Sequence, residues 1–253
     1  MLDKDWLLTC APLGAFDLEK QSWRALGAGV FIYDNPFIWY VTANHIIAEN
    51  SDTPLLVLIN HAKEKRNLID LGAVQKQYQI NWLIDEKNDL AATLFPTNQD
   101  FMLRAIEFSF FTDSESMLPS MICYSVGCPY NLMGFDMEKI TPCVLDGIIS
   151  GIDPKEGRVY VTVPTFPGNS GGPLFIWKQP IAPNGSLNLT TPVVYLGGII
   201  SEYAVVSNGS QPNHDNSPPL HLGIVIPSEA IQRLLTSSAS QILKEKVRSP
   251  TLK

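Results

Sequence analysis

Residues 165–174 read Thr-Phe-Pro-Gly-Asn-Ser-Gly-Gly-Pro-Leu, and in this run small residues flank one serine on both sides. A serine that attacks a carbonyl group needs an exposed turn whose backbone N–H groups are free to bind the oxyanion. Glycines permit the backbone angles of such a turn and let a substrate come close. We therefore expect Ser170 to be a nucleophile, with the N–H groups of Gly168 and Ser170 as oxyanion donors. Taken alone, the run also fits an ordinary glycine-rich hairpin turn.

A hydroxyl that attacks at neutral pH needs a base, and His45 has the most suitable position among the four histidines. It follows the apolar run 37–43, so its side chain stands at the end of an expected strand and reaches toward a cleft. His61 lies among lysine and arginine residues, and His214 lies in a segment rich in proline and asparagine. We assign both of these to solvated loops.

The base needs a carboxylate that fixes its tautomer and stabilises the imidazolium. Asp89 stands immediately before the apolar run 90–95, at the entry to an expected buried strand. Asp85 and Glu86 are rival acids, but they lie in a charged turn where solvation is their expected role. We predict that Asp89 is the partner of His45.

The run around Ser170 also has the Gly-x-Ser-x-Gly pattern of α/β-hydrolases, in which an acid and then a histidine follow the serine. Asp215 and His221 would have to serve here, and they lie in a proline-rich segment. The residues after Ser170 do not alternate between strand and helix patterns. We therefore exclude that fold.

Most of the chain carries the pattern of short β-strands separated by turns, which indicates barrels or a sandwich. The expected strands cover residues 24–33, 37–43, 55–59, 79–84, 90–95, 121–127, 144–149, 159–163, 173–177, 193–201 and 220–226. The polar segment 112–120 is the expected connector between two halves, 1–111 with His45 and Asp89 and 121–227 with Ser170.

A helical pattern is clear only at the end of the chain. Ser228 is the expected N-cap of one helix over residues 228–247. The apolar stripe of that helix consists of Ile231, Leu234, Leu235, Ile242 and Leu243. We expect this helix to pack its stripe against the body of the protein.

The order His45, Asp89, Ser170 is the order found in chymotrypsin. The runs 41–45 (Val-Thr-Ala-Asn-His), 89–91 (Asp-Leu-Ala) and 168–173 (Gly-Asn-Ser-Gly-Gly-Pro) resemble the three signature blocks of trypsin-like serine proteases. The glycine-containing runs 127–130, 147–150 and 223–228 resemble the bacterial Deg-type, or high-temperature-requirement, branch. The matches extend over about residues 27 to 245, nearly the whole chain.

This resemblance implies an all-β fold of two six-stranded antiparallel β-barrels, chymotrypsin-like, with a C-terminal α-helix. It implies a serine endopeptidase that works through a His45-Asp89-Ser170 triad and an acyl-enzyme intermediate. The chain ends soon after the expected helix, so we expect no peptide-binding PDZ module of the Deg type. Asn169 replaces the aspartate that pairs with a newly cut N-terminus in trypsins, and we expect no activation of that kind.

The resemblance also implies residues for substrate binding. The strand around Ser201 is expected to pair with the substrate backbone, and Thr165, Ile200 and Tyr203 are expected to line the binding site. Ser201 either donates a hydrogen bond to Asp89 or is an ordinary strand residue. Pro164 and Ile200 occupy the places where a pocket acid or histidine would stand, so we expect cleavage after an uncharged, small-to-medium residue.

The chain has 253 residues and a formal net charge of −7, without a basic cluster. We expect no nucleic-acid partner, and no membrane span, because no apolar run reaches the necessary length. Residues 1–5 show no leader peptide, which predicts a cytoplasmic protein, or a secreted one if a leader has been removed. The four cysteines are Cys10, Cys123, Cys128 and Cys143. They form either two disulfides in one of three arrangements or free buried thiols.

The expected substrate is a protein or peptide, and neither a metal nor an organic cofactor is implied. Two other functions stay open. The chain either binds partners without turnover, or acts as an effector that a regulatory protein partner activates. The presence of all three triad residues favours the enzyme, because a binding module has no need of them.

Overall fold

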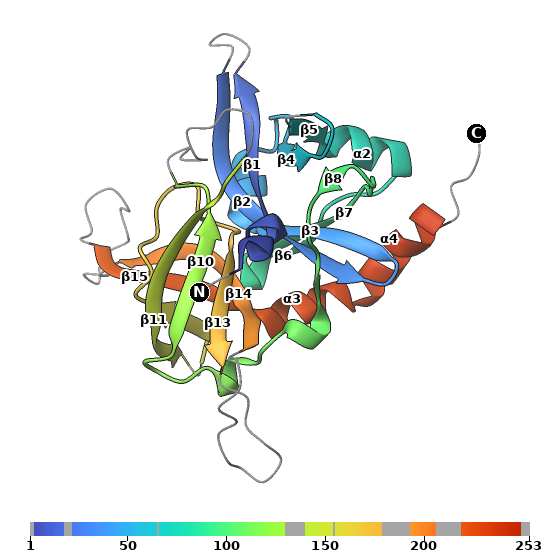
Figure 1. The fold of residues 1–253 in the computed structure, drawn as a ribbon. Coiled ribbons are helices and arrows are strands. Elements are labelled where there is room, and N and C mark those ends of the chain that lie inside the picture. The colour runs from blue at the N-terminus through green and yellow to red at the C-terminus, as the bar shows by residue number, and fades with distance from the viewer. Residues whose placement is uncertain are drawn as a thin grey trace.

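The computed structural model describes residues 3–17, 22–64, 66–129, 140–153, 155–178, 193–205 and 219–248. A β-sheet and a β-barrel lie side by side, and helices at the C-terminal end of the chain run along both (Figure 1). The strands of the first sheet are β1 (Cys10–Asp17), β2 (Ser22–Asp34), β3 (Phe37–Ala43), β4 (Leu56–His61), β5 (Arg66–Asp70), β6 (Leu83–Asp85), β7 (Leu90–Phe95), β8 (Phe101–Met102) and β9 (Ile106–Glu107). The strands of the barrel are β10 (Ile122–Gly127), β11 (Cys143–Asp153), β12 (Arg158–Val161), β13 (Pro173–Lys178), β14 (Val193–Val205) and β15 (Pro219–Pro227).

Helices are short in every part of the chain that the structure describes. The α-helices are α1 (Asn44–Glu49), α2 (Leu71–Tyr78), α3 (Ser228–Leu235) and α4 (Ser238–Arg248). The 3-10 helices are η1 (Lys4–Thr9), η2 (Glu86–Asn88), η3 (Phe108–Phe110) and η4 (Ser114–Ser116). None of the helices within the described ranges has the length and apolar character needed to cross a bilayer.

The first sheet corrects the prediction of two closed barrels. Its strands follow the order β5-β4-β1-β2-β3-β7-β6, with β8 paired to β4 and β9 to β2. Within the described residues this path does not close, because β5 and β6 at its two ends do not pair. Only the last two residues of the expected strand 79–84 are in a strand, the short β6, and helix α2 ends directly before that segment.

Local capping explains why a helix forms at α2. The side chain of Asp70 precedes the helix and accepts the backbone N–H of Ala73, which satisfies one of the free donors of the first turn. Gln79 has a left-handed backbone with φ of 53° and ends the helix. The apolar pattern of this segment is weak, so no helix was predicted here from the sequence.

The second half forms the predicted six-stranded barrel. It closes in the order β10-β11-β12-β15-β14-β13, and each neighbouring pair is antiparallel. Its interior is filled by fully buried apolar side chains, including those of Cys123, Ile149, Val161, Leu174 and Val225. This barrel carries the turn that contains Ser170, between β12 and β13.

The predicted single C-terminal helix is two helices. The chain leaves the helical path at Thr236, whose hydroxyl donates to the Gln232 carbonyl at 2.8 Å, and starts again at Ser238. Serine and threonine favour such breaks because their side chains compete for backbone hydrogen bonds. The break changes the phase of the apolar stripe, so Ile242 is 55% exposed instead of buried. The predicted N-cap, Ser228, is the first residue of α3 and donates instead to the Thr112 carbonyl at 2.7 Å.

The sheet and the barrel share one hydrophobic core. Residues of β2, β3 and β7 pack there with residues of β10, β13, β14 and α3. Trp6 of η1 also belongs to this core, and its ring meets Phe175 of β13 edge-on with centroids 5.0 Å apart.

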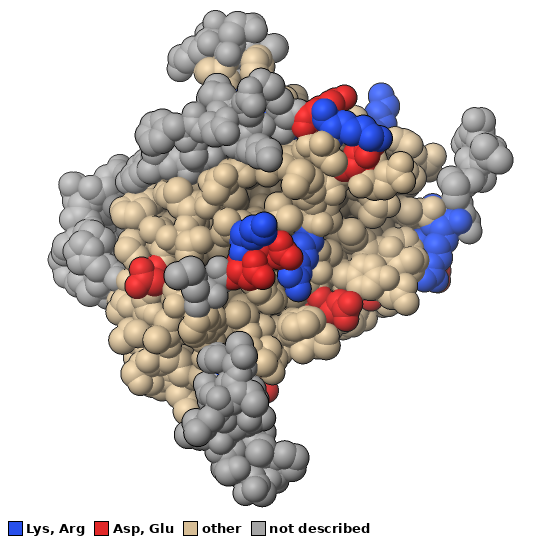
Figure 2. All heavy atoms as spheres, viewed as in Figure 1, with Lys and Arg blue, Asp and Glu red and all other residues tan. Residues whose placement is uncertain are grey.

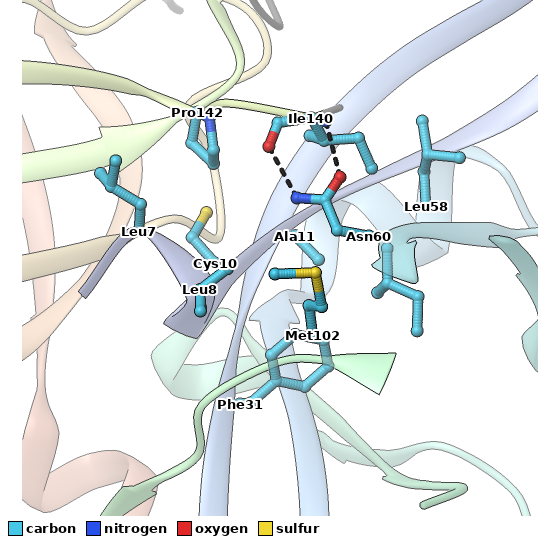
Figure 3. A pocket seen from close by; sticks show the side chains of 11 residues that line it. Leu7, Leu8, Cys10, Ala11, Phe31, Leu58, Asn60, Met102, Ile140 and Pro142 are labelled. Carbon is cyan, nitrogen blue, oxygen red and sulfur yellow. Dashed lines mark hydrogen bonds between the residues drawn. The ribbon is translucent and has the colours of Figure 1, made fainter. Parts of the chain in front are cut away.

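A second link between the two halves lies at Asn60, near the end of β4. Its Nδ2 donates to the Ile140 carbonyl at 2.8 Å, and its Oδ1 accepts the Ile140 N–H at 2.7 Å (Figure 3). The hollow beside these two bonds has a volume of about 10 Å³. A cavity of this size holds at most one water molecule, so we assign the contact a structural role.

The predicted connector 112–120 makes specific contacts in the structure. Met117 is fully buried in the barrel core. The N–H and hydroxyl of Ser114 both donate to Glu229 of α3, at 3.0 and 2.5 Å. The domain boundaries 1–111, 121–227 and 228–247 stay predictions.

Candidate active site

Asp89 lies between η2 and β7 in the left-handed backbone region, with φ of 51°. This conformation costs a residue other than glycine about 1 kcal/mol. Its Oδ1 accepts the backbone N–H of His45 at 2.8 Å, and its Oδ2 lies 2.9 Å from His45 Nδ1. The hydroxyl of Ser201 donates to Oδ2 at 2.5 Å. Asp89 therefore ties α1 of the first half to β14 of the barrel.

His45 is the second residue of α1, and its ring is held in one tautomer. An ionised carboxylate only accepts hydrogen bonds, so Nδ1 carries the proton toward Asp89. Nε2 is then the nitrogen that accepts a proton from another group. The side chain of His45 is 35% exposed, so Nε2 belongs to a ring that a substrate can approach.

His45 and Asp89 shift each other's pKa. The hydrogen bond to Asp89 is the largest cause that raises the pKa of His45, and it outweighs the opposing effect of burial. The negative charges of Glu49 and Glu202 raise the pKa of His45 further. Burial by itself would raise the pKa of Asp89, but the hydrogen bonds from His45 and Ser201 outweigh it and lower that pKa. The pair therefore favours an imidazolium beside a carboxylate.

The turn that contains Ser170 presents two free N–H groups. The N–H of Asn169 donates to the Phe166 carbonyl at 3.0 Å, and that of Gly172 donates to the Asn169 carbonyl at 2.9 Å. The N–H groups of Gly168 and Ser170 donate to none of the described residues. Gly168 has φ of 101°, and a Cβ there would lie 2.2 Å from the Cys128 carbonyl oxygen, so only glycine fits. Both N–H groups are therefore left without an acceptor among the described residues, whereas their neighbours in the turn are paired.

Backbone hydrogen bonds place this turn beside the His45–Asp89 pair. Ser170 accepts the N–H of Ala28 from β2 at 2.8 Å. Gly171 donates to the Ile200 carbonyl at 2.7 Å, one residue before the Ser201 that contacts Asp89. A Cβ on Gly27 would meet both Ile46 of α1 and the Ser170 carbonyl oxygen, at 2.3 and 2.8 Å. α1 and the turn therefore converge on Gly27.

The structure thus brings His45, Asp89, Ser201 and the Ser170 turn to one place. The hydroxyl of Ser170 itself makes no hydrogen bond to His45 or to any other described residue. His61, the rival histidine, accepts backbone N–H groups of Lys63 and Glu64 through its own Nδ1. His214, Asp215 and the side chain of His221 lie outside the described residues.

The model of the trypsin-like peptidase domain matches residues 27–178, which is more than half of the chain. The chain belongs to the trypsin-like peptidase family.

Among solved structures, the chain is similar to a variant of the HtrA-type protease AlgW solved with a tripeptide. The TM-score is 0.52 at 16% sequence identity, and the match covers 91% of this chain and 61% of that chain. At this identity the likeness shows the chymotrypsin-like fold alone, and the chain spans about 61% of the length of the AlgW chain. No curated protein matches the chain.

The residues predicted to bind substrate occupy different environments in the structure. Thr165 is half-buried, and its hydroxyl lies 2.5 Å from where a Cβ of Gly223 would stand. Ile200 contacts the Ser170 turn through its backbone, while its side chain is fully buried in the barrel core. Tyr203 pairs with Gly223 through the backbone, and its side chain lies outside the described part of the chain.

Asn169 is nearly inaccessible, at 1% exposure. Its Nδ2 donates to the Pro164 carbonyl at 3.4 Å, and its Oδ1 lies against Gly127, where a Cβ would come within 2.7 Å. The amide thus occupies a closed space inside the turn, and makes no ion pair there.

The sequence reasoning missed the support beneath the Ser170 turn. Thr42 donates to the Ala28 carbonyl at 2.7 Å, and a Cβ on Gly171 would lie 2.1 Å from that same oxygen. Gly171, with φ of 82°, is therefore packed directly on β2 and β3. The available signal was Thr42, a polar residue inside an apolar strand, because a buried hydroxyl needs a partner.

The four cysteines form no disulfide, which decides between the two alternatives for them. Burial raises the pKa of Cys123 and of Cys128 to about 12, so both stay protonated and unreactive. Cys128 contributes through its backbone, whose N–H donates to the Gly168 carbonyl at 3.2 Å. Within the described ranges, no three His, Cys, Asp or Glu side chains gather as metal ligands would.

Proposed function

We propose that the chain is a serine endopeptidase with Ser170 as nucleophile, His45 as general base and Asp89 as the group that orients the base. The observation that carries this proposal is the free pair of N–H groups at Gly168 and Ser170, next to a histidine fixed by a carboxylate. No other role of the turn requires unpaired backbone donors beside an oriented base.

The reaction proceeds in two acyl-transfer steps. His45 Nε2 takes the proton of the Ser170 hydroxyl as its oxygen attacks the scissile carbonyl, and the Gly168 and Ser170 amides bind the oxyanion. The intermediate collapses to an acyl-enzyme, and the leaving amine receives the proton from His45. A water molecule then attacks the ester, His45 again moves the proton, and the acid product leaves with Ser170 restored. Asp89 stabilises the imidazolium in both steps.

A fluorophosphonate probe tests the nucleophile directly, because it labels an activated serine covalently. We expect the wild type to be labelled and Ser170→Ala to be unlabelled. Ser150→Ala is the matched control, since Ser150 is exposed on β11 in the same barrel. Equal labelling of Ser170→Ala and wild type would show that another residue reacts and would overturn the proposal.

We propose an uncharged, small-to-medium residue before the scissile bond. Thr165 supplies a hydroxyl and no charge, and this hydroxyl lies 2.5 Å from where a Cβ of Gly223 in β15 would stand, which leaves little room beside that strand. A peptide-library cleavage profile measures this preference. A profile dominated by arginine, lysine or glutamate before the cleaved bond would contradict it.

A second candidate function is a peptidase that a partner protein activates. The missing hydrogen bond between Ser170 and His45 favours it, because an activated serine needs that contact. Labelling that begins only after a partner is added would support partner activation, whereas labelling of the isolated chain would support a constitutive enzyme. A folded chain that is never labelled would instead act as a binding module.

A further inference from the structure

A hollow of about 440 Å³ lies behind α1, on the first half of the molecule. Its walls come from α1, the segment that follows it, the start of α2, and the residues around β6. None of His45, Asp89 and Ser170 lines it. Its volume falls within the range of about 300–1,000 Å³ typical of ligand pockets. The hollow is therefore a space separate from the candidate active site.

The inner surface of the hollow is apolar. Ile47, Leu55 and Leu71 form buried parts of its lining. Trp82 is half-buried beside them, and Ile84 is 47% exposed. Covering such surface releases roughly 25 cal/mol for each Å² removed from water. A ligand with an apolar side chain therefore suits this part of the site.

The polar part of the lining offers acceptors. Asn50 Nδ2 already donates to the Ile46 carbonyl at 2.8 Å, and Gln75 Nε2 donates to the Thr93 hydroxyl at 3.3 Å. The oxygen of each amide accepts no hydrogen bond from a described residue. Glu86 adds an exposed carboxylate. Peptide N–H groups and one positive charge match this set.

The hollow is connected to the candidate active site through the backbone of Asp89. Asn44 lines the hollow, and its N–H donates to the Asp89 carbonyl at 3.0 Å. Glu86 also lines the hollow, and its carbonyl accepts the Asp89 N–H at 3.3 Å. A ligand that touches both walls therefore acts on the residue that orients His45.

We propose that this hollow binds a peptide segment in which an apolar side chain adjoins a lysine or arginine, and that binding sets the geometry of the His45–Asp89 pair. The apolar side chain covers Leu55, Leu71 and Trp82, and the basic side chain pairs with Glu86. Binding at the hollow is independent of the proposed function. Its effect on Ser170 rests on that function.

The binding test uses acetyl-Phe-Lys-amide and the Ser170→Ala protein, so that the probe is not cleaved. We expect a saturable shift of the Trp82 indole N–H signal in ¹⁵N-labelled protein, assigned with Trp82→Phe. Acetyl-Phe-Glu-amide and acetyl-Gly-Lys-amide should each bind about tenfold more weakly, which corresponds to about 1.4 kcal/mol. Equal binding of the three peptides, or no shift at Trp82, would overturn the proposal.

A filled hollow provides the second arm. Gly72 lines it on the first turn of α2, and a Cβ there meets only Asp70 Oδ1, at 3.3 Å. Gly72→Leu should abolish the Trp82 shift while the protein stays folded. Gly151→Leu is the matched control, because a Cβ at Gly151 meets nothing within 4 Å, and it should bind like the parent. Unchanged binding in Gly72→Leu would place the peptide elsewhere and overturn the site.

The effect on the active site is measured with Ser170 intact. Saturating acetyl-Phe-Lys-amide should change the rate of fluorophosphonate labelling by about fivefold or more, the usual size of allosteric coupling. Gly72→Leu should remove this dependence. If the labelling rate is the same with and without bound peptide, the proposed coupling between the hollow and the active site is overturned. Peptide binding in a protein that is never labelled would overturn the proposed function and leave the site supported.

Discussion

At the scale of single residues, Asp89 sets the protonation of the site. His45 must be neutral to act as a base, so activity rises with pH as His45 loses its proton. Because Asp89 raises the pKa of His45 above its ordinary value of 6.5, that rise lies at higher pH than for a free histidine. In Asp89→Asn the main cause of the shift is gone, so the half-maximal pH moves down. The rate itself falls by about 10⁴-fold, since the tautomer is no longer fixed.

The pH dependence of fluorophosphonate labelling measures both effects of Asp89→Asn. Glu49→Gln is a suitable control, because Glu49 raises the pKa of His45 by its charge alone. It should move the half-maximal pH slightly downward without a large loss of rate. An upward move in Asp89→Asn would contradict the assigned cause of the shift.

The contact between His45 and Asp89 was predictable from the sequence, because each stands next to an apolar strand, and their side chains lie 2.9 Å apart. The role of Ser170 stays a prediction. The left-handed backbone of Asp89 was not predictable, since it depends on η2 directly before it. The role of Gly171 was also hidden, because the atoms that exclude a side chain there belong to Ala28 and Thr42. Such contacts are made between residues far apart in the chain, so a local sequence pattern cannot predict them.

At the scale of elements, one ion pair fixes α4 to the first sheet. Lys244 is 6% exposed, pairs with Asp34 at the end of β2, and donates to the Leu235 carbonyl at 3.3 Å. Lys244→Ala would leave the Asp34 carboxylate mostly buried without a partner. We expect it to lower the free energy of unfolding by about 3 kcal/mol, as is usual when one member of a buried pair is removed.

Urea denaturation followed by circular dichroism measures the effect of Lys244→Ala. The double variant Asp34→Asn with Lys244→Met should recover much of the loss, because no unpaired charge remains. Lys246→Ala is the control, since Lys246 lies on the exposed side of α4 and donates only to the Gln79 carbonyl. If Lys244→Ala and Lys246→Ala lower the free energy of unfolding equally, the Lys244–Asp34 ion pair does not contribute more than an exposed lysine does.

The elements that were predicted correctly are those with a strong local pattern. In the barrel, β-branched runs between glycine and proline residues predicted β12, β13 and β15 near their observed positions. In the first sheet, residues 71–78 carry only a weak apolar pattern, so no helix was predicted there, and the capping side chain of Asp70 is the main local signal for α2. The break between α3 and α4 occurs at Thr236, whose hydroxyl donates to a backbone carbonyl of α3. Such side-chain hydrogen bonds compete with the backbone hydrogen bonds of a helix, although the apolar pattern of the sequence continues through this point.

At the scale of the whole molecule, the charged side chains form small separate groups (Figure 2), whereas the buried apolar side chains form a core that both halves share. In Figure 2 the charged side chains of the described residues gather in small groups of mixed sign. One example is Arg104, which lies 3.8 Å from Asp5 and above the ring of Trp6. The apolar residues instead form a core that crosses from the sheet to the barrel. Apolar packing therefore joins the two halves, in addition to the hydrogen bonds of Asp89 and Asn60.

This shared core predicts that the two halves unfold together. Phe175 is fully buried in it and touches Trp6, so Phe175→Ala should lower the free energy of unfolding by about 3–5 kcal/mol. Phe16→Ala is the control, because Phe16 is 39% exposed and should change stability by less than about 0.5–1 kcal/mol. Since His45 and Asp89 lie in one half and Ser170 in the other, labelling should be lost in the same transition as the near-ultraviolet circular dichroism. Two separate transitions would show that the halves fold independently and that the shared core does not hold the site together.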